Sequence, residues 1–335
     1  MSLSILYPDA QFVGAPDLEQ EVFGADAILH VHRAEKASEI PPALWRDCDA
    51  VVCFDITIDA ALIGGLSRCR QIVRAGVGFD QIDIAAAAAR AIPVCNTPDY
   101  GTTDVADHAI AMMLALSRGI VAFNDALKLD PAQGWDFLRA PTVRRLAGLT
   151  FGVLGLGRIG TAAALRAKAF EMDVVFFDPY RPSGTELALG LRRVDSVESL
   201  LRQADVLSIH APLTNETENL INAETLAIMR SDAILVNTAR GPIVHTAALL
   251  SALREGRIAA AGLDVLPVEP SAPGDSLVDA WRDCDPAFAG RLILSPHAAF
   301  YSPSSLIDLR MKSAKVALDY LKGGRLRNCV NGLAS

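Results

Sequence analysis

Three polar side chains in the second half of the chain, Arg240, Glu269 and His297, follow short apolar runs. A planar guanidinium can hold carboxylate and ketone oxygens through parallel hydrogen bonds. An imidazole can give or take a proton near neutral pH, and a neighbouring carboxylate would raise its pKa and orient its ring. Taken singly, such residues are more often a surface ion pair, a solvated acid and a packed histidine. Their meaning therefore depends on the elements that carry them.

A glycine-rich turn upstream favours the chemical interpretation. The sequence GLGRIG at 155–160 follows an apolar run and opens an expected helix at 157–170. Gly155 permits a tight turn, Gly157 lets the backbone approach a pyrophosphate, and Gly160 allows the helix to pack closely on the strand. The N–H groups at the start of such a helix attract a diphosphate. The motif therefore predicts a dinucleotide site.

An acidic residue follows the next expected strand. Asp178 lies 18 residues beyond Gly160 and ends the sequence VVFFD. Its carboxylate can accept hydrogen bonds from the ribose hydroxyls of adenosine and would repel a 2′-phosphate, so the pattern favours NAD over NADP. Arg181 lies close enough to weaken this preference, and Asp178 could alternatively cap the turn before Pro179.

The expected elements alternate between strands and helices in two series. The first series has strands at 4–7, 27–30, 50–54, 71–74 and 92–96 and a short helix at 83–90. The second follows a long helix at 102–120 and has strands at 150–154, 173–177, 206–210, 233–237, 260–264 and 292–295, with helices at 157–170, 196–203, 222–228 and 246–255. A surface loop is expected at 267–290 and a last helix at 305–322. This alternation predicts parallel sheets covered by helices.

The three polar residues follow strands of the second series at their carboxyl ends. Ligands of open α/β sheets bind beyond the carboxyl ends of the strands, so we expect these side chains to meet in one crevice. Reduction of a 2-oxo acid needs its carboxylate held, its ketone oxygen polarised and a proton supplied. Arg240 suits the first two tasks, and His297 with Glu269 beside it suits the third.

With these features in place, the chain resembles the D-isomer-specific 2-hydroxyacid dehydrogenase family from about Ile5 to Leu333. The matching blocks are RAGVGFDQID, TTDVADHA, GVLGLGRIG, SIHAPLT, NTARGPIV, AAGLDVLPVEP and LSPHAAF. Within the family it most resembles the C-terminal-binding protein branch, through VCNTPDYG, ALRAKAF, FFDPY, ALGL and NCVNG. The resemblance implies transfer of a hydride between NADH and a small 2-oxo or D-2-hydroxy acid.

The resemblance also implies roles for individual residues. The catalytic residues would be Arg240, Glu269 and His297, and substrate contacts would come from Val77, Gly78, Arg240, His297 and Phe300. Together with the glycine motif and the strand-end position of His210, it implies cofactor contacts from Val105, Gly155, Gly157, Arg158, Ile159, Gly160, Asp178, His210, Ala211, Pro212, Thr217, Thr238, Ala239, Arg240, Asp264 and His297.

The implied fold is α/β, with two doubly wound parallel-sheet domains. A Rossmann cofactor domain at 100–298 would be inserted into a flavodoxin-like substrate domain formed by 1–99 and 299–335. Family members are typically homodimers. Two departures leave the substrate preference open: the stretch 270–296 is longer than usual, and Phe300 and Tyr301 stand where eukaryotic C-terminal-binding proteins carry a Trp soon after the catalytic His.

Composition narrows the range of partners. Lys and Arg total 31 against 39 Asp and Glu, and the net charge of −8 disfavours nucleic acid and membrane surfaces. The six cysteines form no CxxC pair, and the N-terminus shows no signal-peptide pattern, so we expect a cytoplasmic protein. No metal site is expected: His30 and His32 share one face of an expected strand but lack a third ligand.

Two other functions remain open. One is an NAD(H)-sensing interaction module like the C-terminal-binding proteins, which would present a peptide groove in its cofactor-bound dimer. The other is a different enzyme on the same scaffold, such as a phosphite or formate dehydrogenase. The intact set of Arg240, Glu269 and His297 disfavours both.

Overall fold

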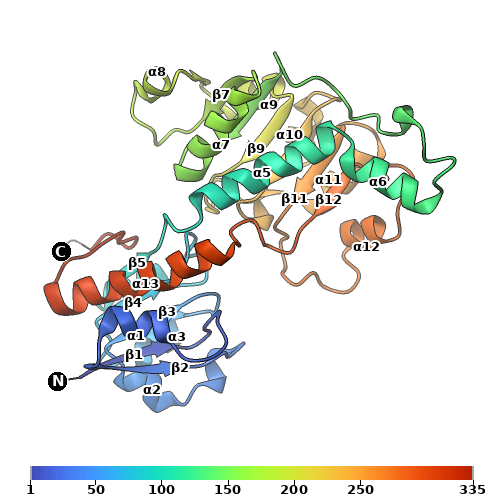
Figure 1. Cartoon of the computed structure of the whole chain (residues 1–335). Coiled ribbons are helices and arrows are strands. Elements are labelled where there is room, and N and C mark those ends of the chain that lie inside the picture. Colours follow the sequence, from blue (N-terminus) through green and yellow to red (C-terminus); the bar gives the residue numbers. More distant parts are fainter. Residues whose placement is uncertain (1, 334–335) are drawn as a thin grey trace. The chain divides into compact units, whose positions relative to one another are not determined.

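The computed structural model describes residues 2–333 and divides them into two compact units. Unit 1 contains the chain up to Gly101 and again from Tyr301, and unit 2 contains Thr102–Phe300. In Figure 1, unit 1 is coloured blue, cyan and red, and unit 2 runs from green to orange. The chain crosses between units after Gly101 and after Phe300, where we expected crossings after residues 99 and 298.

Unit 1 is built on five parallel strands in the order β2-β1-β3-β4-β5. This is the flavodoxin-like order that the resemblance implied. The strand β3 reads AVVC and is buried at every position, because helices cover both faces of the sheet. The strands are β1 (Leu3–Tyr7), β2 (Ala27–Val31), β3 (Ala50–Cys53), β4 (Gln71–Arg74) and β5 (Val94–Asn96).

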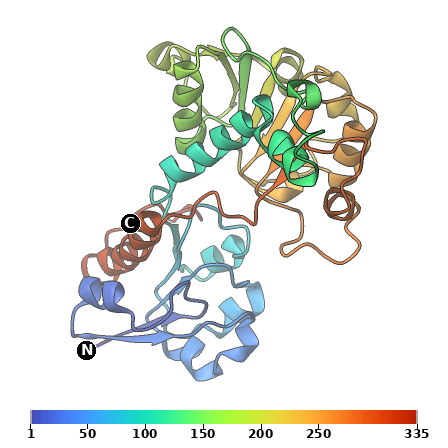
Figure 2. The same cartoon turned by 45° about the vertical axis from the view of Figure 1, so that its right-hand side comes forward.

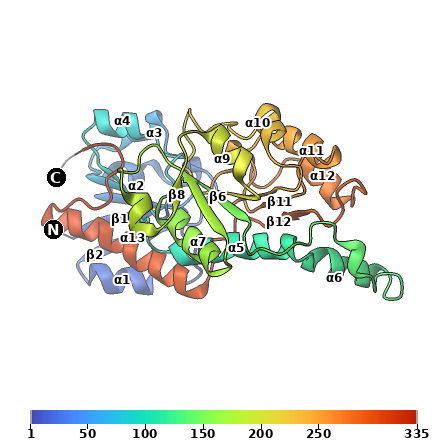
Figure 3. The same ribbon diagram turned by 90° about the horizontal axis from the view of Figure 1, so that it is seen from above.

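The two faces of this sheet carry separate apolar cores. Successive residues of β3 alternate between them: Val51 packs with Trp45 and Ile63, whereas Val52 packs with Phe23 and Ala314. The second core is covered by α1 and α13, which lie side by side in Figures 1, 2 and 3. The helices of unit 1 are α1 (Asp17–Phe23), η1 (Ala37–Glu39), α2 (Pro42–Asp47), α3 (Ala60–Gly65), α4 (Ile84–Ala89) and α13 (Pro303–Gly323).

Unit 2 holds seven parallel strands in the order β12-β11-β10-β9-β6-β7-β8. The chain order reverses between β6 and β9, which is the Rossmann arrangement and the place where such sheets bind a dinucleotide. The edge strand β8 was not expected, because its two arginines form no apolar run. The strands are β6 (Thr150–Leu154), β7 (Asp173–Phe177), β8 (Arg192–Arg193), β9 (Val206–Ile209), β10 (Ile234–Asn237), β11 (Ala260–Leu263) and β12 (Leu292–Leu294).

Helices cover both faces of this second sheet. Val153 and Leu154 of β6 point to opposite cores, one covered by α5 and α7 and the other by α9, α10, α11 and α12 (Figure 3). The helices of unit 2 are α5 (Thr102–Ser117), α6 (Ile120–Leu129), η2 (Phe137–Arg139), α7 (Arg158–Ala169), α8 (Thr185–Leu189), α9 (Val197–Gln203), α10 (Ala223–Ile228), η3 (Gly241–Ile243), α11 (Thr246–Arg254) and α12 (Ser276–Arg282).

Two sequence expectations for unit 2 were wrong. The helix expected at 102–120 ends at Ser117, because Gly119 adopts the left-handed region at φ +63° and a separate helix begins after it. The surface loop expected at 267–290 contains α12. Asp275 is the N-cap of that helix and accepts hydrogen bonds from the N–H groups of Leu277 and Val278. Leu277 is buried.

Within the described residues, no single helix is long and apolar enough to span a membrane. The helices α5 and α6 meet that length and composition only as a pair, and they are bent by 57° at the break between them. In the structure, Val105, Ile110 and Met113 are among the buried residues of α5.

Candidate active site

The glycine turn joins β6 to α7 and leaves the start of the helix open. Gly155 has φ +89°, and a Cβ there would lie 2.7 Å from the backbone nitrogen of Ala211. A Cβ on Gly160 would lie 2.1 Å from the carbonyl oxygen of Gly155. Gly157 precedes α7 without any side chain that caps the helix. Only glycine fits at 155 and 160, and the first N–H groups of α7 can bind an anion.

Asp178 lies against this turn. Its carboxylate accepts hydrogen bonds from the N–H of Leu156 at 2.8 Å and from the N–H of Tyr180 at 2.9 Å. The guanidinium of Arg181 is 3.6 Å from the same carboxylate. Asp178 therefore caps the following turn and also borders the backbone that the pyrophosphate is predicted to approach. The cation beside it partly offsets the repulsion that a 2′-phosphate would meet.

Two polar side chains follow the neighbouring strands. The Nε2 atom of His210 lies 2.8 Å from Oγ of Ser208, and burial lowers the pKa of His210 to about 4. The buried hydroxyl of Thr238 has no hydrogen-bond partner among the residues that the structure describes. A buried polar atom of this kind marks a place where a ligand can supply the missing bond. The glycine turn and Thr238 together fit the dinucleotide that the sequence predicts.

The other predicted cofactor residues all lie in unit 2. Thr217 is tied to the segment after β9, because its hydroxyl donates to the carbonyl of Pro212 at 2.7 Å. The N–H of Ala239 donates to the side chain of Asn237 at 3.0 Å. Each remaining residue belongs to a helix named above or to a segment that follows a strand: Val105 (α5), Arg158 and Ile159 (α7), and Ala211 (after β9).

The side chains of His297 and Glu269 are joined by a short hydrogen bond. Nδ1 of His297 is 2.6 Å from Oε2 of Glu269, and the other carboxylate oxygen accepts the N–H of Leu266 at 2.7 Å. An ionised carboxylate only accepts hydrogen bonds, so Nδ1 must carry the proton that it shares with Glu269. Nε2 is then the nitrogen of His297 that can exchange a proton with a substrate.

Arg240 belongs to a segment that packs against Leu266, the residue whose N–H binds Glu269. It immediately precedes η3, and Nη1 of its side chain donates to the carbonyl of Ala239 at 2.7 Å. The next residue is Gly241, where a Cβ would lie 1.9 Å from the carbonyl carbon of Leu266. Leu266 is also the residue whose N–H binds Glu269. The backbone therefore brings the three predicted catalytic residues into one region of unit 2.

Asp264 organises the turn that presents His297. Its side chain is fully buried, and its carboxylate accepts the N–H groups of Ala298 and Ala299, each at 2.9 Å. Its carbonyl accepts the N–H of His297 at 2.7 Å. We predicted Asp264 as a cofactor contact, and its hydrogen bonds in the structure hold the catalytic turn. Sequence reasoning missed this role, because Asp264 lies more than thirty positions from its partners Ala298 and Ala299.

The predicted substrate residues divide between the units. Val77 and Gly78 belong to unit 1, and the carbonyl of Val77 accepts a hydrogen bond from the side chain of Asn96 at 2.6 Å. Phe300 belongs to unit 2, and its ring lies 6.3 Å from that of His297 in an edge-to-face arrangement. Contact of Val77 and Gly78 with the substrate stays a prediction.

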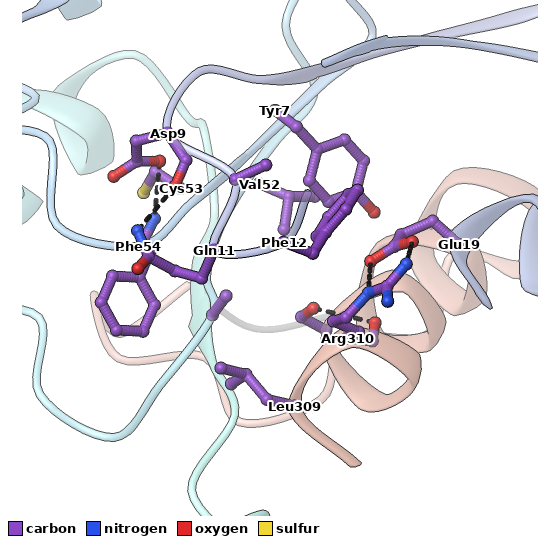
Figure 4. A pocket seen from close by; sticks show the side chains of 13 residues that line it. Tyr7, Asp9, Gln11, Phe12, Glu19, Val52, Cys53, Phe54, Leu309 and Arg310 are labelled. Carbon is purple, nitrogen blue, oxygen red and sulfur yellow. Dashed lines mark hydrogen bonds and ion pairs between the residues drawn. The ribbon is translucent and has the colours of Figure 1, made fainter. Parts of the chain in front are cut away.

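A small cavity of about 30 Å³ lies in unit 1 at the carboxyl ends of β1, β3 and β4 (Figure 4). The carboxylate of Asp9 accepts the N–H groups of residues 54–56, which fixes the segment that follows β3. Across the cavity, Arg310 forms an ion pair with buried Glu19 at 2.7 Å and stacks on the ring of Phe12 at 3.9 Å. The lining residues are Tyr7, Asp9, Ala10, Gln11, Phe12, Glu19, Val52, Cys53, Phe54, Ala75, Leu309, Arg310 and Ser313.

Residues 2–333 contain no group of three or more His, Cys, Asp or Glu side chains placed to hold a metal ion. His108, on α5, is hydrogen-bonded to Ser295, immediately before the catalytic turn. No local sequence signal links these two residues, because they are 187 positions apart.

Comparison with known proteins identifies the family. Residues 110–299 match the NAD binding domain of D-isomer specific 2-hydroxyacid dehydrogenases. A glyoxylate reductase from Thermofilum pendens is 38% identical over 279 residues, covering 81% of this chain and 77% of that protein. Another from Korarchaeum cryptofilum is 37% identical over 290 residues, covering 85% and 83%. The crystal structure of D-lactate dehydrogenase from Aquifex aeolicus, complexed with NAD and lactic acid, has a TM-score of 0.85 at 29% identity and covers 98% of this chain and 100% of that one.

Proposed function

The chain belongs to the D-isomer-specific 2-hydroxyacid dehydrogenase family, and from that premise we propose that it uses NADH to reduce glyoxylate, hydroxypyruvate or a similar small 2-oxo acid. The observation that carries the proposal is the connected set of Arg240, Glu269 and His297. The relatives named glyoxylate reductase support the substrate class. The expected closeness to the C-terminal-binding protein branch stays a prediction, and we do not propose an interaction module.

Each residue of the set has a distinct task. Bound NADH supplies the hydride that the carbonyl carbon of the substrate accepts. The guanidinium of Arg240 binds the carboxylate and polarises the ketone oxygen. Nε2 of His297 donates the proton that this oxygen takes up. Glu269, 2.6 Å from Nδ1, accepts a hydrogen bond from that nitrogen and orients the ring for the transfer.

The test is a steady-state assay with NADH and a panel of glyoxylate, hydroxypyruvate, pyruvate, and branched and aromatic 2-oxo acids. We expect turnover with at least one small member, and we expect His297→Ala to lower kcat about a hundredfold or more while NADH still binds. His30→Gln, on the edge strand β2 of unit 1, is the control and should match wild type. No turnover of any panel member by a protein that binds NADH would contradict the proposal.

We also propose that NAD is preferred over NADP. Asp178 supports this preference, because a carboxylate beside the glycine turn repels a 2′-phosphate. Arg181, 3.6 Å from it, reduces the repulsion without removing it. Titration of tryptophan fluorescence with each reduced cofactor should give a lower Kd for NADH. Equal Kd values for NADH and NADPH would contradict this part of the proposal.

We propose that two copies of the chain associate. Large apolar side chains gather in α6 and the segment after it: Leu129 is 90% exposed, Trp135 and Phe137 are 83% exposed, and Leu138 is 74% exposed. Exposed apolar residues so close in sequence favour burial against a protein surface, and homodimers are typical of the family. Light scattering of wild type should give twice the chain mass. Trp135→Arg should weaken the dimer, whereas Leu187→Arg, at an exposed site on α8, should not.

A cytoplasmic location without nucleic-acid or membrane partners is also our proposal. All six cysteines are free thiols in the structure, which suits a reducing compartment. The net charge of −8 disfavours phosphate backbones and anionic lipids. Fractionation of the source cells tests the location directly, and recovery of the protein outside the soluble cytoplasmic fraction would contradict it.

A further inference from the structure

A second histidine stands behind the turn that carries His297. His108 lies in α5, and its Nε2 is 3.0 Å from Oγ of Ser295. The hydroxyl of Ser295, which follows β12, donates to Oδ1 of Asp264 at 2.5 Å. Nε2 of His108 is itself 3.7 Å from that carboxylate oxygen. The three side chains therefore form one hydrogen-bonded row that ends on Asp264.

The far end of this row holds the catalytic turn. Asp264 accepts hydrogen bonds from the backbone of residues 297–299, through its carbonyl and both carboxylate oxygens. His297 has φ +51°, a left-handed backbone conformation that is strained for a residue with a Cβ and that its surroundings must stabilise. The position of the imidazole of His297 therefore depends on how firmly Asp264 is fixed.

The hydrogen bonds in the row have a defined direction. An ionised carboxylate has no proton to give, so the hydroxyl of Ser295 must donate to Asp264. A hydroxyl carries one proton, so Ser295 can only accept from His108. Nε2 of His108 must then carry a hydrogen. This bond keeps the proton of Ser295 pointed at Asp264, because the side of the oxygen that faces the imidazole is occupied by an N–H donor.

We propose that His108 is a positioning residue for proton transfer by His297 and acts through Ser295 and Asp264. The inference rests on the proposed function, in which His297 supplies the proton. His108 does not have to touch the substrate. Loss of its N–H lets the hydroxyl of Ser295 rotate, Asp264 loses a fixed donor, and the turn holds the imidazole of His297 less firmly. Misplacement of a catalytic group slows the proton step more than it weakens binding.

The central experiment compares two substitutions of His108 with a neighbouring control. His108→Leu removes the N–H donor, and His108→Gln can place an amide N–H near the position of Nε2. Asp107→Asn, at the residue before His108, breaks an exposed ion pair with Arg166 and leaves the row intact. We expect His108→Leu to lower kcat about tenfold, the worth of one hydrogen bond, and His108→Gln to restore most of it. The control should match wild type.

Two further readouts separate positioning from general loss of structure. For His108→Leu, the Kd for NADH and the KM for the 2-oxo acid should stay within about twofold of wild type. The solvent deuterium isotope effect on kcat should rise, because a misplaced His297 makes proton transfer more rate-limiting. A fall in thermal stability with an unchanged kcat, or an equal loss of kcat in the Leu and Gln variants, would overturn the proposal.

Ser295→Ala interrupts the same row one step further along. If His108 acts through Ser295, the double variant of Ser295→Ala and His108→Leu should lose little more kcat than the more impaired single variant. Multiplied losses would show that the two residues act independently and would overturn the proposal. The assay of wild type separates failure of this inference from failure of the proposed function.

The tautomer of His108 can be read without any substrate. Spectra of ¹⁵N-histidine-labelled protein, assigned with His108→Gln, should show hydrogen on Nε2 of His108. A neutral ring protonated only on Nδ1 would overturn the proposed direction of the row, whether or not a substrate is known.

Discussion

Lowering the pH should destabilise unit 2 through the imidazole of His210. Burial lowers the pKa of His210 to about 4 from its ordinary value of 6.5. Because the folded pKa lies below the unfolded one, the unfolded chain binds the additional proton between these values. The stabilising contribution of His210 is therefore complete above about pH 6.5 and is lost as the pH falls toward 4.

The shift sets the size of the effect. A fall from 6.5 to about 4 corresponds to roughly 3 kcal/mol of unfolding free energy at about 1.4 kcal/mol per pKa unit. At about pH 5, roughly 2 kcal/mol of this has been lost. His210 as a whole residue is partly exposed, so these figures are upper values.

Urea denaturation near pH 7.5 and near pH 5, followed by tryptophan fluorescence, measures the effect. His210→Gln can keep the hydrogen bond with Ser208 but does not titrate. When the pH is lowered from about 7.5 to about 5, wild type should lose up to about 2 kcal/mol more unfolding free energy than His210→Gln. His30→Gln, the control, retains His210, so its unfolding free energy should depend on pH as that of wild type does. A gap between wild type and His210→Gln that is the same at both pH values would refute the reasoning.

Three further predictions follow from the site. Glu269→Gln should lower kcat about tenfold with little change in KM, because a neutral amide forms a weaker hydrogen bond with Nδ1 and orients the ring of His297 less firmly; unchanged kcat would contradict this. Gly241→Ala should lower kcat about a hundredfold, because its Cβ would lie 1.9 Å from the segment that carries Glu269, whereas Gly64→Ala, with open space around it, should have no effect. Asp178→Ala should lower the ratio of the Kd for NADPH to the Kd for NADH about tenfold, because it removes a carboxylate that repels the 2′-phosphate. An unchanged ratio would argue against a role of Asp178 in cofactor preference.

The alternation of strands and helices could be predicted because its signals are local. Apolar runs such as AVVC in β3 predicted the strands, and the glycine turn after β6 predicted the cofactor-binding fold. The two elements that the sequence did not predict, β8 and α12, also have local explanations. The strand β8 consists of two arginines at a sheet edge, and α12 is a seven-residue helix within a Pro- and Asp-rich stretch. The two residues of β8 carry no apolar period. The helix α12 does place Leu277 and Ala280 on one buried side, but it is too short for a helical period to be recognised in the sequence.

The catalytic set could be predicted only in part. The residue types and strand-end positions of Arg240, Glu269 and His297 were visible in the sequence. The row from His108 through Ser295 to Asp264 was not, because its hydrogen bonds join residues 187 and 31 positions apart. A helix histidine looks the same in sequence whether it is packed or orients a catalytic turn. Three-dimensional contacts, which one sequence does not encode in any local pattern, distinguish the two.

The stereochemistry of the product tests the central claim most directly. Hydroxypyruvate and NADH are incubated with wild type and with His297→Ala, and the 2-hydroxy acid formed is resolved on a chiral column. Wild type should yield only the D isomer, and the variant should form very little product. An L or racemic product, or equal yields from the two proteins, would contradict the assignment of the Arg240, Glu269 and His297 site.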